Sequence, residues 1–163
     1  MKDDYTTLLA YNRWADEQVI NALRSLTPEQ YKTLPAPDCR SVHSTLLHMA
    51  DATFIWVRRI QGQTITTRVD ESTLPTFDDA VRFLNESHDA VASVLATLPP
   101  NAGETQITYL DLQKNSRTLP LWVLLRHLTN HSSYHRGQLT ARLIDAGIEP
   151  PLIDLVLWAM HQT

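Results

Sequence analysis

Four long stretches of this sequence place apolar residues at roughly the spacing of an α-helix, and they constrain its fold more than any other feature. In the first stretch, apolar side chains recur from Leu8 to Leu26. Glycine is scarce, at 4 of 163 residues, which disfavours a β-barrel or a glycine-rich nucleotide-binding fold. The predicted helices cover about residues 5–26, 41–60, 76–98 and 120–146. We therefore expect an all-α protein built as a four-helix bundle.

Shorter elements are expected between and after the long helices. Residues 27–30 (Thr-Pro-Glu-Gln) resemble a capping box with proline at the first helical position, which predicts a short helix. Polar and apolar residues alternate over 106–118 with a slip of one residue, which predicts a short β-hairpin before the fourth long helix. The prolines at 150–151 predict the start of an extra C-terminal helix. The connection at 61–75 looks irregular, and loops of this length in a compact domain are often functional. From the length of the chain we expect one domain over 1–163.

Cysteine usage and charge exclude several classes of protein. Cys39 is the single cysteine, so the chain can form no internal disulfide and has no cysteine cluster for zinc or iron–sulfur. The formal net charge of −4 argues against a nucleic-acid-binding surface, which needs a basic patch. The N-terminus resembles no signal peptide, and the apolar run at 152–160 is too short to cross a membrane. We expect a cytoplasmic protein in which any metal site is built from histidines and carboxylates.

Histidine spacing is the strongest sign of chemistry in the chain. His127, His131 and His135 follow one another at intervals of four residues on the fourth predicted helix, so neighbouring side chains share a face. Seven histidines placed at random would give roughly 0.26 pairs at this spacing, whereas two are present. Two such imidazoles can hold one divalent ion, although they can equally line a polar face. The spacing alone leaves open which of the two pairs would bind a metal.

A third ligand would have to come from another helix, and His48 is the best candidate. It lies among apolar residues in the middle of the second predicted helix, where an unpaired buried imidazole would be costly. His43 lies at the start of that helix and is expected to be a cap-region or surface residue. His88 lies in a polar stretch and is expected to be exposed, and His161 near the C-terminus is expected to play no part.

Several motifs together resemble those of one known family. Residues 131–138 read HSSYHRGQ, residues 11–15 read YNRWA, and residues 44–49 read STLLHM, followed by Trp56. A glycine, two prolines and an aspartate complete the pattern over 147–154. On these motifs the chain resembles the DinB/YfiT-like metalloenzymes over nearly its whole length. The resemblance implies a four-helix bundle, often a homodimer, with a divalent ion, commonly zinc or nickel, held by three histidines.

Carried over by position, the resemblance implies that the metal ligands are His48, His131 and His135. It favours the second histidine pair of the fourth helix, which leaves His127 as a supporting or structural neighbour. Among the polar residues near the motifs, Asp51 is expected to be a solvated surface acid.

Two further residues of the motif region carry expectations of their own. Arg136 is expected to pair with an acid across the bundle rather than to bind an anionic substrate. Gly137 is expected to permit a close approach of helices, because glycine inside a helix costs about 1 kcal/mol relative to alanine.

Three functions were weighed against these features. The first is a metal-dependent enzyme, either a hydrolase or a thiol S-transferase, that acts on a small molecule; some members of the family it resembles use a low-molecular-weight thiol. The second is a non-enzymatic metal-binding bundle that acts in a stress response or by interaction, with the apolar segment 152–158 as a dimer surface. DNA binding, suggested only by the family's association with DNA damage, is opposed by the negative charge.

Overall fold

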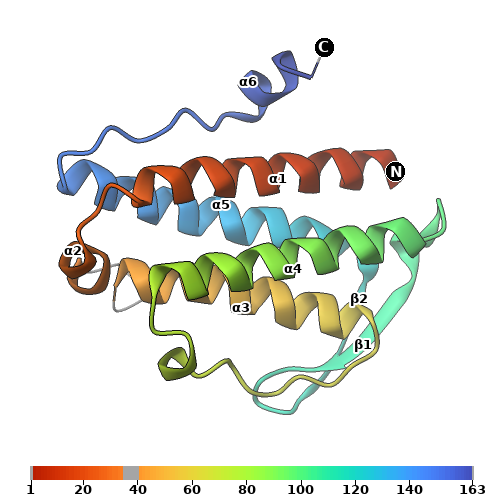
Figure 1. Ribbon diagram of the computed structural model, residues 1–163. Helices are drawn as coiled ribbons and strands as arrows, with labels where there is room; N and C mark the ends of the chain where they lie inside the picture. Colours follow the sequence, from red (N-terminus) through yellow and green to blue (C-terminus); the bar gives the residue numbers. More distant parts are fainter. Residues whose placement is uncertain (1, 35–40, 163) are drawn as a thin grey trace.

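The protein is mostly helical, with a two-stranded antiparallel hairpin (Figure 1). The computed structural model describes residues 2–34 and 41–162, so Cys39 lies outside the described residues. The elements are α1 (Lys2–Leu23), α2 (Pro28–Thr33), α3 (Val42–Ile60), η1 (Glu71–Thr73), α4 (Phe77–Thr97), η2 (Ala102–Glu104), β1 (Gln106–Leu110), β2 (Ser116–Pro120), α5 (Leu121–Asp145) and α6 (Leu155–Met160). None of the described helices is long and apolar enough to cross a membrane.

The four long helices lie side by side, and each packs against two of the others (Figure 1). Helices α1 and α3 both contact α4 and α5, so each apolar face is covered by its neighbours. The buried apolar residues divide into two clusters along the helices. One cluster contains Leu46, Leu84 and Leu139, and the other contains Val91 and Leu125.

Between the two apolar clusters, the long helices carry a layer of buried polar side chains. On α1, the layer lies between Leu9 of one cluster and Val19 of the other. Buried polar groups must find partners inside the protein, so this layer fixes how the helices meet. Its members are Asn12, Asp16, Asp51, Thr53, Ser87, His88, Ser132, His135 and Arg136.

The helix starts follow from capping side chains that the sequence displays. Thr27 and Gln30 form the expected capping box at the start of α2. Ser41 accepts a hydrogen bond from the Ser44 N–H and so begins α3, and Thr76 begins α4 in a second capping box. The predicted long helices are therefore present, with ends that differ by a few residues from those expected.

The hairpin is present, whereas the expected start of the last helix is wrong. Gln106 pairs with Pro120 and Leu110 with Ser116, and the predicted slip in the alternation coincides with the end of β1. In the turn, the Asp111 carboxylate accepts the backbone N–H groups of residues 113 and 115. The segment 150–154 is not helical, and α6 begins only after Asp154.

Candidate metal centre

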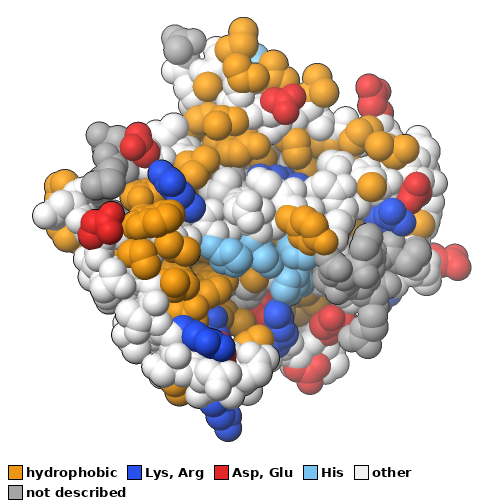
Figure 2. Space-filling model, turned by 180° about the vertical axis from the view of Figure 1, so that it is seen from behind, with side chains coloured by type: hydrophobic (Ala, Val, Ile, Leu, Met, Phe, Trp, Pro, Cys, Tyr) orange, Lys and Arg blue, Asp and Glu red, His pale blue; other side chains and the backbone are white. Residues whose placement is uncertain are grey.

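Three histidines from α3 and α5 meet beside the polar layer, to which one of them, His135, belongs. Their ligand atoms all lie within 4.8 Å of one another. The Nε2 atoms of His48 and His131 are 3.0 Å apart, and the ring centroid of His135 lies 4.6 Å from that of His48 and 4.5 Å from that of His131. His135 is buried and the other two are half-buried. Figure 2 shows histidine side chains reaching the surface together on one face, beside apolar and basic side chains.

The hydrogen-bonding partner of His135 leaves one of its ring nitrogens free for a metal. Its Nδ1 lies 2.8 Å from Oε1 of Gln138, one helical turn further along α5. A carbonyl oxygen can only accept, so Nδ1 carries the proton and Nε2 keeps a free lone pair. A metal-binding histidine typically donates its second N–H to a carbonyl or carboxylate in this way. The donor set therefore fits a divalent ion.

Burial favours the neutral form of two imidazoles of this region, those of His131 and His127, and the neutral form is the one that binds metals. The pKa of His131 is lowered to about 3, first by desolvation and then by the nearby charges of the other imidazoles and Arg68. Desolvation also lowers the pKa of His127. At neutral pH, binding of a second proton to the rings of His131 and His127 therefore does not compete with binding of a cation.

The fourth candidate, His127, lies beside the group rather than within it. Its ring is 5.0 Å from that of Trp56 in an edge-on contact and 5.5 Å from that of His131. The structure therefore distinguishes the two pairs that spacing could not, His127/His131 and His131/His135. His131 and His135 face His48 across the helices, while His127 packs against an aromatic side chain of α3.

Arg68, from the 61–75 connection, contacts both His48 and Asp51. No pattern in the sequence had indicated Arg68 as a residue of the site. The Arg68 Nη1 lies 2.9 Å from Nδ1 of His48 and 3.4 Å from Oδ2 of Asp51. The other Asp51 oxygen accepts the backbone N–H of Val69 at 3.2 Å. The expectation that Asp51 is a solvated surface acid is wrong, because its side chain is buried and anchors the 61–75 connection to α3. Burial raises the pKa of Asp51, while these two donors oppose the rise.

Comparison with known proteins decides the family. The model of the DinB family matches residues 1–163. The chain belongs to the DinB family. It is also 26% identical to Protein DinB of Bacillus subtilis (strain 168) over 172 residues, an alignment that covers 97% of this chain and 95% of that protein. The resemblance inferred from the motifs is therefore confirmed for the whole chain.

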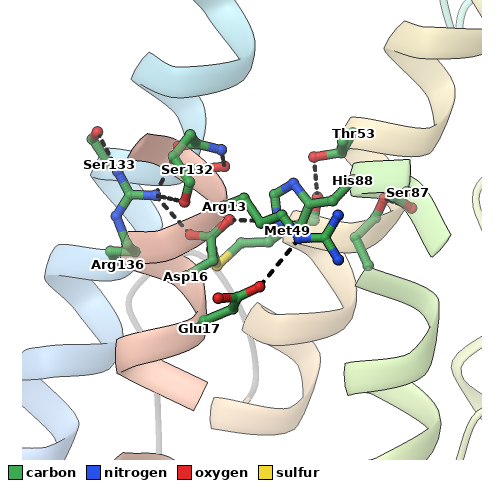
Figure 3. Close-up of polar contacts among 12 residues, drawn as sticks. Arg13, Asp16, Glu17, Met49, Thr53, Ser87, His88, Ser132, Ser133 and Arg136 are labelled. Carbon is green, nitrogen blue, oxygen red and sulfur yellow. Dashed lines mark hydrogen bonds and ion pairs between the residues drawn. The ribbon is translucent and has the colours of Figure 1, made fainter. Parts of the chain in front are cut away.

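The arginine of the family motif, Arg136, joins α5 to α1 (Figure 3). Arg136 donates to Asp16 at 2.6 Å and to the Asn12 side chain at 2.7 Å, which confirms the expected pairing with an acid on another helix. Asn12 in turn donates to the Ser132 hydroxyl at 3.4 Å. Because Ser132 and Arg136 each follow a histidine of the group, these contacts set the rotation of α5 that presents both rings.

Two other histidines are buried, against expectation. His88 is 5% exposed, and its Nε2 lies 3.0 Å from the second carboxylate oxygen of Asp16 (Figure 3). The polar neighbours of His88 in the sequence suggested exposure, but the acid that satisfies it lies on another helix. His43 is buried as well, with its Nδ1 2.8 Å from the Tyr31 hydroxyl, and burial lowers its pKa. His161 is exposed, away from the group.

The explanation offered for Gly137 in this DinB-family motif is wrong. A Cβ added at Gly137 would meet nothing within 4 Å, so no neighbouring helix needs the glycine for a close approach. Nothing else in the structure explains this residue.

Proposed function

We propose that this DinB-family protein is a divalent-metal-dependent enzyme, with His48, His131 and His135 as the metal ligands and zinc or nickel as the ion. The observation that carries the proposal is the convergence of three imidazoles from two helices, in a group that contains no carboxylate or thiol of the described residues. Three protein ligands leave a coordination position open, as in catalytic sites. An ion held there lowers the pKa of a bound water or thiol, or polarises a carbonyl.

The substrate that we propose is a small molecule, and the reaction is a hydrolysis or a transfer to a low-molecular-weight thiol. Two of the three imidazoles are half-buried, so a small molecule has access to them. The described residues contain no cysteine, so none of them offers a thiolate to the metal. We further infer that the four long helices form a four-helix bundle and that the chain is a single domain. We also infer that the protein is a cytoplasmic homodimer that binds neither nucleic acid nor a membrane.

A non-enzymatic role in protein interaction has one observation in its favour. The C-terminal part of the chain exposes large apolar side chains that would be covered in an assembly. These side chains are Leu152, Leu155, Val156 and Met160. Under this alternative the metal would stabilise the fold, and the apolar surface would bind a partner or a second copy.

The metal ligands are tested by metal analysis of the purified protein and of His48→Ala. We expect about one divalent ion per chain in the unchanged protein and loss of that ion in the variant, because two imidazoles bind far more weakly than three. His161→Ala is the matched control, since this exposed histidine lies outside the group. Full metal content in His48→Ala would remove His48 from the site.

The enzymatic function is tested by a turnover screen with ester, amide and thiol-conjugation substrates in the presence of Zn²⁺, Ni²⁺ or Mn²⁺. We expect turnover that a chelator abolishes and that added metal restores. Such a result would exclude the interaction-only alternative. Turnover that survives complete removal of the metal would contradict the proposal.

A further inference from the structure

The contact between Arg68 and His48 has a consequence for the protonation of the ring. A guanidinium can only donate hydrogen bonds, so His48 Nδ1 must accept from Arg68 Nη1 across their 2.9 Å contact. In a neutral imidazole the single proton is then on Nε2, the atom that faces His131 at 3.0 Å. In this tautomer, Nε2 has no lone pair for a metal.

Binding of an ion through Nε2 reverses this arrangement. The proton of a neutral His48 must then be on Nδ1, so an N–H of the ring and an N–H of Arg68 would face one another. Two donors cannot share a hydrogen bond, and the added cation repels the guanidinium as well. The guanidinium of Arg68 therefore has to leave His48 when the metal binds.

The main chain keeps Arg68 near the site after that change. The next residue, Val69, donates its backbone N–H to the buried carboxylate of Asp51 on α3. The Arg68 side chain is 49% exposed and its contact with Asp51 is long, at 3.4 Å, so the guanidinium can turn without unfolding the loop. It then lies at the solvent side of the histidine group with unused donors.

We propose that Arg68 is an anion-binding residue of the metal site, released by metal binding, and that the ligand it selects carries a carboxylate. A divalent ion and Arg68 together bring three positive charges against the single negative charge of Asp51, so an anionic ligand is favoured over a neutral one. Planar carboxylates match the fork of a guanidinium, which can donate two parallel hydrogen bonds to them. This inference rests on the proposed metal site.

The test uses Co²⁺ as the bound ion, because its visible absorption changes when a ligand enters the open position. Acetate is the anionic probe and imidazole is the neutral one. In Arg68→Met, acetate affinity is expected to fall about tenfold, the size of a charge-assisted hydrogen bond at a partly exposed site. Imidazole affinity is expected to stay the same, and Co²⁺ affinity to rise severalfold because the competing donor and charge are gone.

Arg24→Met is the matched control for the loss of one arginine. Arg24 is 51% exposed and also contacts one aspartate, Asp78, but it lies just after the last residue of α1. The Arg24→Met variant should bind Co²⁺, acetate and imidazole as the unchanged protein does. A second variant, Arg68→Lys, keeps the charge without the planar fork and should retain part of the acetate affinity.

The outcomes separate the two proposals. An acetate affinity in Arg68→Met equal to that of the unchanged protein, or an equal loss of acetate and imidazole affinity, would overturn the role of Arg68 while leaving the metal site in place. An unchanged protein that binds no Co²⁺ would overturn the metal site itself, and the role of Arg68 with it. A selective loss of acetate affinity supports both.

Discussion

Replacing Arg136 with methionine is expected to lower the free energy of unfolding by about 3–5 kcal/mol. Arg136 and Asp16 are each 1% exposed, and the guanidinium donates to Asp16, Asn12 and Ser133. Removing the guanidinium takes away the cation that faces the buried Asp16 carboxylate and leaves its contact with His88, and an uncompensated buried charge is costly. Thermal unfolding should show the midpoint falling by roughly 6–20 °C.

Arg13→Met provides the control for this prediction. Arg13 also contacts two acids, Glu17 and Asp89, but its side chain is 38% exposed. Exposed ion pairs are worth about 0–1 kcal/mol, so this variant should unfold close to the unchanged protein. Adding Asp16→Asn to Arg136→Met removes the stranded charge and should recover part of the loss. Equal stabilities for Arg136→Met and Arg13→Met would contradict the structural role assigned to the buried pair.

Replacing Gln138 with leucine is expected to lower zinc affinity by about 10–100-fold. The Gln138 Oε1 accepts the Nδ1 proton of His135 at 2.8 Å, inside the protein. Without this acceptor, nothing keeps the proton on Nδ1, and the tautomer with Nε2 protonated cannot bind the ion. Leucine has a similar size and leaves the apolar packing of α5 in place. Competition with a chromogenic chelator measures the affinity.

Gln138→Glu separates the loss of the acceptor from a general disturbance of the helix. A carboxylate also accepts from Nδ1, so this variant should bind zinc at least as tightly as the unchanged protein. The pair of substitutions therefore predicts opposite results at one position. Zinc affinity in Gln138→Leu that matches the unchanged protein would show that Gln138 does not orient His135.

The helices and two of the three proposed metal ligands could be predicted from local patterns in the sequence. Apolar periodicity and capping residues such as Thr27 and Thr76 act within a few residues, so they fixed the elements to within a turn. The spacing of His131 and His135 placed both on one face of α5 for the same reason. His48 could not be joined to them by spacing; its apolar neighbours in the second helix and the family motif pointed to it.

The contacts that the sequence missed all join residues far apart in the chain. His88 and Asp16 are 72 positions apart, and each looks like an ordinary surface residue beside its own neighbours. Arg68 lies in an irregular connection without periodicity, where the length of the loop was the single available signal. Asp51 was misjudged because its burial depends on Val69, which folds back from that loop. Such pairings follow from the packing of helices and loops, which no local pattern records.

A crystal of the purified protein grown with zinc, measured on both sides of the zinc absorption edge, tests the metal site most directly. The account predicts one anomalous peak bounded by ring nitrogens of His48, His131 and His135, with the His127 ring still against Trp56. A peak between His127 and His131, or no zinc peak at the histidine group, would contradict it.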